Sequence, residues 1–367
     1  MLRYIEIKQE LKNRICKMNN GDPIPSRTKL CGLLDTSRAT VDKAIKELEK
    51  EGYLESHIGS GTYVARRLEG VDTEVMNWCL IVPDITENIY SRMAGSIERT
   101  AREWNVNIIL CNSENSSDKQ SEYIRRLIMA GVDGFIIVPV VMKTVVEGIG
   151  LYQSLIQSKI PFVFCNRDVE GIYAPIVKSN DFYGGYIATL HLLDRGYRNI
   201  VFLALKRYRT SIERCQGYIS AIQSRNQEII RKRILMLDNE NIEDCHDSLL
   251  MLLRSETPVD AVFCFNDDIA FQAIRAVEDA GLRVSDDIGI MGYGDNENLL
   301  DMKVPLTTVT HKTEDVGNLA ARVLRKKMEK RKEEIFEYYL IEPEIVVRES
   351  CLGRCFTSPF SPDTSTG

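Results

Sequence analysis

Hydroxyl-bearing and cationic side chains gather in three short groups between residues 26 and 60. Arginine presents two parallel donors that suit the edge of guanine, and short hydroxyl groups suit phosphate oxygens or base edges. Arg38 lies next to Ser37 and near Thr40 at the start of a predicted helix, whose free N–H groups favour phosphate. These residue types predict contact with double-stranded DNA. The candidate residues are Ser26, Arg27, Thr28, Ser37, Arg38, Thr40, Lys43, His57, Gly59 and Ser60.

Three short helices and a hairpin are predicted to position these groups. Apolar residues at helical spacing predict a first helix over 3–18, which a glycine and two prolines end. Ser26 is predicted to cap a second helix and Ser37 a third, which Gly52 ends. Residues 53–64 then follow the pattern of a strand, a glycine-rich turn and a second strand. This order predicts a winged helix-turn-helix, in which the third helix enters the major groove and the hairpin forms the wing.

The charge of the chain divides at the end of this segment. The net charge is −6, yet residues 1–68 hold 13 Lys and Arg against 9 Asp and Glu, a balance of +4. The remainder holds 34 against 44, a balance of −10. A basic segment on an acidic remainder suits a protein that contacts phosphate at one end only. For Arg38 and Lys43 the alternative is an ordinary solvated helix surface.

From Trp78 onward, short apolar runs alternate with amphipathic helices. The first series of predicted strands covers 79–83, 107–111, 134–138 and 161–165, and the second covers 175–178, 199–203, 232–237, 260–264 and 288–292. Helices are predicted near 91–104, 119–130, 182–194, 212–225, 243–254 and 267–281. Continuous apolar strands alternating with helices indicate parallel sheets covered on both faces, and the strand number indicates two doubly wound lobes. The predicted fold class is α/β, with domains at 1–66 (winged helix-turn-helix), 67–76 (linker), 77–351 (two lobes, binding the effector and dimerising) and 352–367 (disordered tail).

Composition argues against several other classes of protein. No apolar run approaches the roughly 20 residues of a transmembrane helix, and the first residues lack the apolar core of a signal peptide. We therefore expect a cytoplasmic protein with no membrane partner rather than a secreted sugar-binding protein. The ten cysteines stand singly, without Cys-x-x-Cys, which predicts buried thiols rather than disulfides or a metal site.

No motif for catalysis or for a cofactor is present. The chain lacks Gly-x-Gly-x-x-Gly after its first predicted strand, the phosphate-binding loop, Gly-x-Ser-x-Gly and His-Glu-x-x-His. Its four histidines are scattered along the chain. We expect no catalytic residue, no metal and no cofactor; an enzyme on a doubly wound scaffold is the alternative.

Residues 4–64 resemble the winged helix of the GntR family. Five segments carry the resemblance: Ile24-Pro25-Ser26, Ser37-Arg38-x-Thr40-Val41, Ala44-Ile45-x-x-Leu48, Gly52-Tyr53-Leu54 and Gly59-Ser60-Gly61-Thr62-Tyr63-Val64. Thr28 and Asp42 stand where the family commonly has arginine. A carboxylate repels phosphate unless it accepts from a cytosine amino group or pairs with Lys46. The resemblance implies DNA binding, without the family's base preference.

Residues 77–351 resemble the LacI and galactose-repressor group, which is related to periplasmic sugar-binding proteins. The resemblance rests on Ile81-Val82-Pro83-Asp84, 131–136, 160–163, Gly184-Gly185, Gly196-Tyr197, Arg214-x-x-Gly217-Tyr218, Phe265-Asn266-Asp267, 287–293, 305–309 and 343–350. It implies a two-lobed fold of the type I periplasmic-binding-protein kind. A GntR-type segment ahead of such a domain is similar to the arrangement in arabinose repressors.

In such folds the ligand lies between the lobes, at the carboxyl ends of parallel strands. Positions that follow the predicted strands are therefore candidates, and Arg, Asp and Asn side chains suit a ligand rich in hydroxyl groups. The resemblance adds Arg214 as the family arginine that binds ligand oxygens, and Tyr90 as the aromatic that stacks on the ligand. The candidates are Ile89, Tyr90, Asn166, Arg167, Arg214, Asn266, Asp267, Asp295 and His311.

Some of these residues have a structural alternative. Asp181 and Asp267 could cap the helices that follow them, and Arg167 and Arg214 could form salt bridges between the lobes. The chain also departs from the family at the ligand site: Gly294-Asp295 replaces two aspartates, Asn180-Asp181 reverses the usual order, and His311 replaces a glutamine. The resemblance therefore specifies no particular sugar.

Together these features predict a transcription regulator, of the repressor type, whose affinity for operator DNA is controlled by a small ligand. We expect a homodimer, because paired helix-turn-helix units read half-sites in successive major grooves. The resemblance implies a sugar as the ligand and repression that the ligand relieves. A non-sugar metabolite such as a purine is the alternative ligand.

Overall fold

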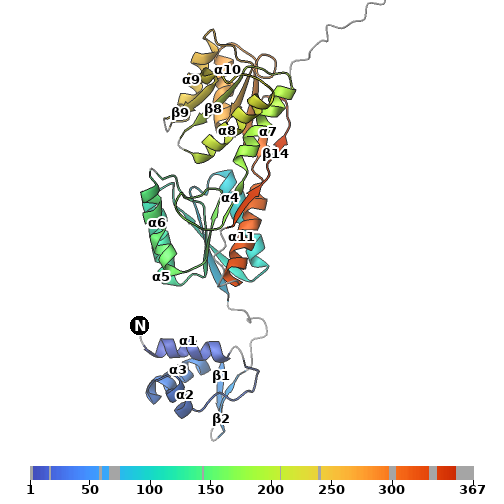
Figure 1. Ribbon diagram of the computed structural model, residues 1–367. Helices are drawn as coiled ribbons and strands as arrows, with labels where there is room; N and C mark the ends of the chain where they lie inside the picture. Colours follow the sequence, from blue (N-terminus) through green and yellow to red (C-terminus); the bar gives the residue numbers. More distant parts are fainter. Residues whose placement is uncertain are drawn as a thin grey trace, which may run out of the picture. The chain divides into compact units, whose positions relative to one another are not determined.

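The computed structural model divides the chain into two compact units, Met1–Glu74 and Val75–Gly367, called here the head and the body (Figure 1). The structure describes residues 3–15, 18–57, 60–65, 75–142, 144–206, 208–238, 241–296, 303–329 and 337–352. The predicted linker at 67–76 and the predicted disordered tail at 352–367 fall almost wholly outside the described residues.

The head contains three helices and a hairpin, in the order predicted. The elements are α1 (Arg3–Ile15), α2 (Arg27–Leu33), α3 (Arg38–Lys50) and the antiparallel strands β1 (Leu54–His57) and β2 (Gly61–Val64). Val41, Ile45 and Leu48 of α3 are fully buried, together with Leu30 of α2. The three- and four-residue spacing of these apolar side chains places them on one face of α3, which packs into the core of the head.

The first lobe of the body is built on a six-stranded parallel sheet with the order β13-β7-β6-β5-β3-β4. Helices α4 and α11 pack on one face of this sheet, and α5 and α6 pack on the other. The strands are β3 (Met76–Val82), β4 (Val106–Asn112), β5 (Gly134–Ile137), β6 (Phe162–Cys165), β7 (Ile176–Ser179) and β13 (Tyr338–Ile341), and the helices are α4 (Asn88–Arg102), α5 (Ser117–Ala130), α6 (Val145–Ser158) and α11 (Thr313–Glu329).

The second lobe has a six-stranded sheet with the order β14-β12-β11-β10-β8-β9, parallel except for the antiparallel edge strand β14. Its core joins the strands to the surrounding helices in one cluster. The strands are β8 (Ile200–Leu205), β9 (Ile234–Leu237), β10 (Ala261–Cys264), β11 (Gly289–Tyr293), β12 (Thr307–Thr310) and β14 (Glu344–Val346), and the helices are α7 (Asp181–Asp194), α8 (Arg209–Ser224), η1 (Arg231–Arg233), α9 (Glu243–Leu253) and α10 (Asp267–Asp279).

Two lobes with parallel sheets confirm the predicted fold class, with one strand misplaced. The prediction that puts 175–178 in the second series is wrong, because β7 pairs with β6 in the first sheet. The reason is that the chain leaves the first lobe only after this strand. Five further elements lie outside the predicted ranges: α6, α11, β12, β13 and β14.

The chain passes between the lobes three times. It crosses after β7, crosses back after β12 and crosses again between β13 and β14. Each lobe is therefore assembled from separate stretches of chain. A hydrogen bond links the first and the third crossing, because Asn180 N–H donates to the carbonyl oxygen of Ile341 at 2.9 Å.

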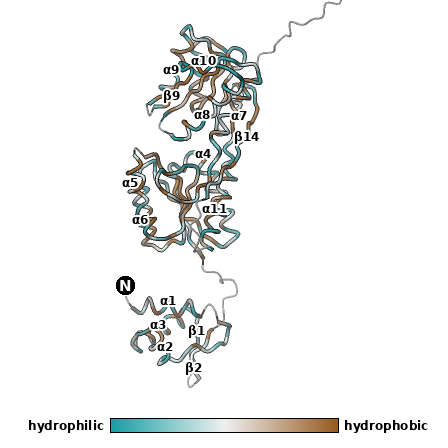
Figure 2. The backbone as a smooth tube through the Cα atoms, in the orientation of Figure 1, coloured by the Kyte–Doolittle hydropathy of each residue, from teal (hydrophilic) through white to brown (hydrophobic). Residues whose placement is uncertain are grey.

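The strands form the apolar centre of each lobe. Figure 2 shows brown, hydrophobic backbone concentrated along them. Strand β8 is buried at all six positions, and β5, β6 and β10 at all four, so none shows the alternation of a half-exposed strand. This is the pattern of parallel strands covered by helices on both faces.

Helices α7 and α8 pack against each other through glycines. A Cβ atom on Gly217 would lie 2.1 Å from the carbonyl oxygen of Phe182, and one on Gly185 would lie 2.2 Å from that of Arg214. Backbone atoms cannot rotate away as a side chain can, so this contact requires glycine at both positions.

We expect Gly217→Ala to lower the free energy of unfolding of the body by about 3 kcal/mol or more, because the added methyl group forces the two helices apart. Urea unfolding followed by circular dichroism measures the change. Gly150→Ala is the control: Gly150 is exposed within α6 and has no atom within 4 Å of an added Cβ. That variant should be neutral or stabilised by up to about 1 kcal/mol. Equal effects at both positions would contradict the packing argument.

Candidate functional site

The first turn of α3 presents Arg38 to solvent. Its side chain is 74% exposed, and its only ion pair within the described residues is a long one, 3.9 Å from Nε to Asp42. Ser37 caps the helix: its Oγ accepts from Thr40 N–H at 3.3 Å and lies 2.8 Å from Thr40 Oγ1. The two hydroxyl groups therefore stabilise the start of the helix. The exposed guanidinium of Arg38, with only this long contact to Asp42, can donate to a partner outside the head.

Asp42 is held by Arg27, not by Lys46. Arg27 Nε donates to Asp42 Oδ1 at 2.7 Å, and its Nη1 donates to Thr62 Oγ1 at 3.2 Å. The suggested Asp42–Lys46 pair is therefore wrong, because Asp42 pairs with Arg27 at the start of α2 and, at longer range, with Arg38 one turn earlier in α3. The Arg27–Asp42 pair neutralises the acidic side chain that stands where arginine is common in the GntR family.

The other candidate residues of the head lie at its surface. Thr28 and Lys43 are exposed, with Lys43 Nζ 3.9 Å from the centre of the Tyr4 ring. Ser26 Oγ caps α2 by accepting from Lys29 N–H at 3.4 Å. In the wing, His57 is exposed, Ser60 Oγ lies 2.6 Å from Tyr63 Oη, and Gly59 lies outside the described residues.

A cavity of about 400 Å³ opens in the body among the carboxyl ends of strands from both sheets. Residues that follow β3 and β6 come from the first lobe, and residues that follow β8, β10 and β11 come from the second. Eight of the nine predicted ligand-binding residues line it: Ile89, Tyr90, Asn166, Arg167, Arg214, Asn266, Asp267 and His311.

Asp295 is the predicted residue that the structure keeps out of this lining. Its Oδ1 accepts from Arg348 Nη2 at 2.6 Å, and Arg348 also donates to the carbonyl oxygen of Leu306. The glycine before it has φ of 141°, which turns the chain so that Asp295 faces Arg348. Asp295 therefore ties two loops of the second lobe together.

Arg214 is buried on the cavity wall, and each of its three nitrogen atoms donates a hydrogen bond. Its Nε and Nη2 donate to Asp181 Oδ1 at 2.8 and 2.6 Å, and its Nη1 donates to the carbonyl oxygen of Phe265. The guanidinium carbon lies 3.5 Å from the ring centre of Tyr293 and 4.5 Å from that of Phe265. All three partner residues belong to the second lobe, so a salt bridge between the lobes is not its role.

The suggested capping roles of the two aspartates are wrong, since the asparagine before each one is the cap. Asn180 Oδ1 accepts from Tyr183 N–H at 3.1 Å, and Asn266 Oδ1 accepts from Ile269 N–H at 2.9 Å. Asp267 instead accepts from Thr308 Oγ1 at 2.6 Å and from Asn296 N–H at 2.8 Å. Burial raises the pKa of Asp267, which these two donors oppose.

Arg167 reaches into the cavity from the first lobe. Its Nη2 donates to Tyr90 Oη at 2.8 Å and its Nη1 to the carbonyl oxygen of Pro139 at 3.1 Å. The guanidinium carbon is 5.3 Å from the ring centre of Tyr208, which begins α8 in the second lobe. Burial raises the pKa of Tyr90 to about 12, so its hydroxyl keeps its proton. Arg167 thus contacts both lobes.

His311 lies at the second crossing between the lobes. Its ring centre is 4.7 Å from that of Tyr293, and its Nδ1 is buried with no hydrogen-bond partner among the described residues. Burial and the charge of Arg214 lower the pKa of His311 well below its ordinary value, so the ring is neutral. A buried polar atom without a partner on a cavity wall is a position where a ligand or a water molecule completes the bonding.

Sequence reasoning missed part of the cavity lining. Tyr208, Phe265 and Tyr293 add aromatic rings, and Asp268 adds a carboxylate. Tyr208 and Phe265 stack with ring centres 5.4 Å apart and planes 8° apart. Phe265, Asp268 and Tyr293 could have been selected by the rule that picked Asn266, since they end or follow strands. Tyr208 lies three residues after β8, nearer to its strand than Asp268 is to β10, so the same rule could have selected it.

The described residues contain no group of three or more His, Cys, Asp and Glu side chains arranged to hold a metal ion. The eight cysteines that the structure describes are free thiols, and seven of them are buried. Among the helices of the described part, none is both long and apolar enough to cross a membrane.

Comparison with known proteins agrees with this architecture. Residues 3–64 match the family of bacterial regulatory proteins called gntR, and residues 189–351 match the periplasmic binding protein-like domain. The chain is 29% identical over 357 residues to the arabinose metabolism transcriptional repressor of Geobacillus stearothermophilus, a match that covers 95% of this chain and 97% of that protein.

A second relative and a solved structure extend the comparison. The ribose operon repressor of Halalkalibacterium halodurans is 30% identical over 277 residues, covering 75% of this chain and 79% of that protein. The chain belongs to the family of bacterial transcriptional repressors that includes this ribose operon repressor. A LacI family regulator from Enterococcus faecium, solved with bound ribose, matches this repressor with a TM-score of 0.62 and 26% identity over 75% of this chain and 98% of its own. The predicted GntR-type head and LacI-type body of the repressor are thereby confirmed.

Replacing His311 should reduce the loss of stability in acid. The unfolded side chain takes up a proton near pH 6.5, whereas the folded one stays neutral because its pKa is lowered. The free energy of unfolding should therefore fall by up to about 1.4 kcal/mol per pH unit below that point. We expect His311→Gln to remove this contribution, measured by urea unfolding between about pH 7.5 and pH 5.5.

His246→Gln is the control with the opposite sign. Hydrogen bonding to Asp247 and then Asp279 raises the pKa of His246, so this residue adds stability as the pH falls through its raised pKa. Its loss should steepen the acid slope. His191, whose pKa burial lowers, is present in both variants and cancels. A slope that is the same in the His311 variant and the unmodified chain would contradict the neutral, buried assignment.

Proposed function

We propose that this repressor holds operator DNA through α3 and the wing, and that a sugar bound in the body cavity weakens this hold. The observation that carries the proposal is the cavity of about 400 Å³, to which both lobes contribute polar side chains. A ligand that contacts both lobes favours one arrangement of the lobes over another, and such a preference is what couples a binding site to a distant head.

The chemistry of the lining supports a hydroxylated ring as the ligand. Arg167, Asn266 and Asp268 supply donors and acceptors, and Tyr208 and Phe265 supply flat apolar faces. A sugar needs both, since its hydroxyl groups must be satisfied while its ring faces are apolar. The relatives point the same way, because one is a ribose operon repressor and one solved structure contains ribose. The alternative of a purine gains support from the four aromatic residues of the lining, which suit a flat base.

In this proposal, ion pairs between the lobes couple ligand binding in the body to DNA binding by the head. Lys178 in β7 of the first lobe is 2% exposed and donates to Glu213 in α8 of the second lobe at 2.6 Å. Arg209 of the second lobe lies 3.3 Å from Asp168 of the first. Because each ion pair joins residues of different lobes, its length changes when the lobes move apart or together. We propose that the ligand shifts this closure, and that the cavity binds its ligand without chemically changing it.

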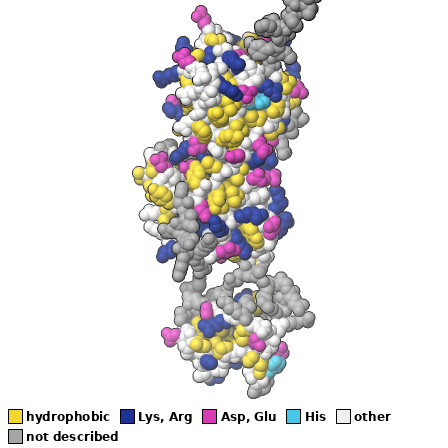
Figure 3. Space-filling model, turned by 45° about the vertical axis from the view of Figure 1, so that its right-hand side comes forward, with side chains coloured by type: hydrophobic (Ala, Val, Ile, Leu, Met, Phe, Trp, Pro, Cys, Tyr) yellow, Lys and Arg dark blue, Asp and Glu magenta, His cyan; other side chains and the backbone are white. Residues whose placement is uncertain are grey.

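A homodimer is part of the proposal, as is action in the cytoplasm without a membrane partner. Large hydrophobic side chains remain exposed on both lobes, including Met129 and Tyr173 of the first and Met251 of the second. Figure 3 shows hydrophobic side chains gathered on the visible face of each lobe. Exposed apolar patches of this kind mark sites of protein association. Sedimentation of the purified chain tests the dimer directly.

The whole proposal is tested by fluorescence anisotropy with duplexes from the DNA that flanks the gene. The full chain should bind one of them with an affinity that falls steeply as salt rises. A sugar that raises the melting temperature of the chain should also lower this affinity. Absence of salt-dependent binding would refute the DNA-binding part. A purine as the stabilising compound would replace the sugar.

Arg38→Ala should weaken operator binding roughly 10- to 100-fold, because an arginine at a base edge contributes a few kcal/mol of discrimination. The same anisotropy assay measures this change. Ligand-induced stabilisation of the body should be unchanged. Arg102→Ala is the matched control, since Arg102 is 71% exposed and pairs with a carboxylate four residues away, as Arg38 does. If both substitutions have the same effect on DNA binding, Arg38 does not contact DNA.

Arg167→Gln should leave DNA binding intact and weaken sugar binding at least about tenfold, the loss expected when a charged donor to a buried ligand is removed. Isothermal titration calorimetry with the stabilising sugar measures it. Arg348→Gln is the control, since Arg348 is also half-buried and donates to a carbonyl oxygen, but lies outside the cavity lining. Unchanged sugar affinity in the Arg167 variant would remove this residue from the site.

A further inference from the structure

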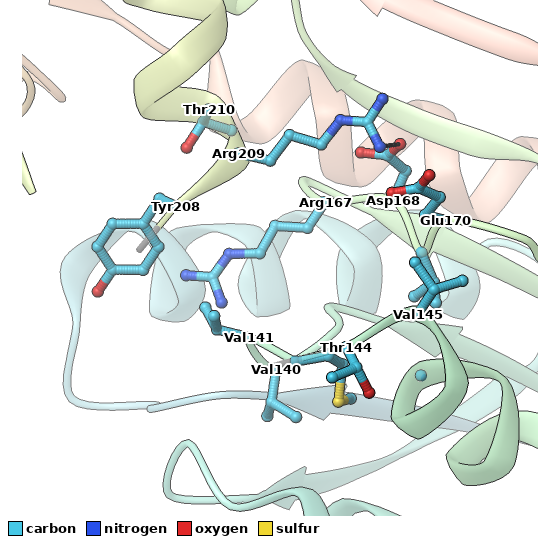
Figure 4. A pocket seen from close by; sticks show the side chains of 13 residues that line it. Val140, Val141, Thr144, Val145, Arg167, Asp168, Glu170, Tyr208, Arg209 and Thr210 are labelled. Atoms are coloured by element: carbon cyan, nitrogen blue, oxygen red, sulfur yellow. Dashed lines mark ion pairs between the residues drawn. The ribbon is translucent and has the colours of Figure 1, made fainter. Parts of the chain in front are cut away.

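The main cavity adjoins another, smaller cavity. A second cavity of about 250 Å³ lies between the first lobe and the start of α8, and it shares Arg167, Tyr208 and Thr210 with the main cavity. Figure 4 shows Arg167 extending toward Tyr208, with Val140 and Val141 below it. The two cavities therefore meet at these shared residues, and we call the second one the side chamber.

The side chamber differs in chemistry from the main cavity. Its wall from the first lobe is formed by Val140, Val141 and Met142 after β5, by Val145 at the start of α6, and by Val169. A sugar ring with its full set of hydroxyl groups gains little there, because apolar side chains cannot satisfy those groups. This wall of the chamber therefore suits a group with an apolar face that can pack against it.

Three charged side chains lie along one side of the chamber. Figure 4 shows Arg209 reaching Asp168, with Glu170 beside them. The Arg209–Asp168 ion pair joins the second lobe to the first at 3.3 Å, so it bounds the chamber at that side. Glu170 makes no hydrogen bond or ion pair with the described residues, which leaves its carboxylate able to accept from an occupant. A chamber of this size, bounded in this way, accommodates a single ring rather than a long chain.

We propose that the effector is a glycoside: a hydroxylated ring in the main cavity, joined through its glycosidic oxygen to a second, mainly apolar group in the side chamber. The inference rests on the proposed function, because it takes the main cavity to be the sugar site. The link between the two groups passes Arg167 of the first lobe and Tyr208 of the second, which are two of the three residues that line both cavities. An occupant of both cavities spans the lobes at two places instead of one.

The experiment compares matched ligands by isothermal titration calorimetry on the full chain. The probes are ribose, arabinose, xylose, glucose and galactose, each with its methyl and 4-nitrophenyl glycosides. For the sugar that binds, the 4-nitrophenyl glycoside should bind at least about tenfold more tightly than the methyl glycoside, because only its aromatic ring reaches the chamber.

Filling the chamber should remove that advantage. Val145→Trp places a large side chain in the chamber and should abolish the gain of the 4-nitrophenyl glycoside, while the methyl glycoside binds as before. Val146→Trp is the control, since Val146 is the next residue of α6, is 80% exposed and does not line the chamber. Val141→Phe, in the loop after β5, repeats the test from another wall should the Val145 variant fail to fold.

The outcomes separate this inference from the function on which it rests. If a monosaccharide binds and its two glycosides bind equally well, the side chamber is not a ligand site and the sugar-sensing function stands. If the preference for the aromatic glycoside survives in both chamber-filling variants, the second group lies elsewhere and the inference is wrong. If no sugar or glycoside binds, the proposed function fails and the inference fails with it.

Discussion

The charge of Arg214 has to be neutralised inside the second lobe, and much of the ligand cavity is arranged around that requirement. Asp181 supplies the counter-charge, Phe265 supplies a carbonyl oxygen, and the Tyr293 ring lies against the guanidinium. These partners come from the start of α7, the end of β10 and the end of β11. A buried ion pair with one partner removed is strongly unfavourable, so the pair fixes these three elements relative to α8. Burial first, and then the same charge, lowers the pKa of His311 and keeps its ring neutral.

The order of most elements and the position of the cavity could be predicted from local patterns. Runs such as Phe-Val-Phe-Cys at 162–165 contain only apolar residues, which indicates a strand covered on both faces, and polar residues just after such runs lie together because parallel strands end at one edge. Ser26 and Ser37 at helix starts likewise predict caps. Eight of the nine residues selected by these rules or by the family resemblance line the cavity.

What could not be predicted depends on contacts between distant segments. Asp295 follows a strand as the other candidates do, but its carboxylate pairs with Arg348 instead of lining the cavity. No local sequence pattern near either residue predicts this pair. Asp42 turns to Arg27, 15 positions earlier, rather than to the lysine one turn along its own helix. Strand β7 is buried along its length like the neighbouring strand β6, so its lobe is decided by where the chain crosses and not by its burial.

The threefold crossing of the chain has a consequence for synthesis. Strands β13 and β14 are adjacent in the sequence, yet each forms an edge of a different sheet. Neither lobe can complete its hydrogen-bonded ladder until residues 338–346 have emerged from the ribosome. The head, made from residues 3–64, has no such dependence and can fold while the body is still being translated. A chain cut short before β13 would thus carry a finished DNA-contacting module on an incomplete sensor, unable to respond to any metabolite.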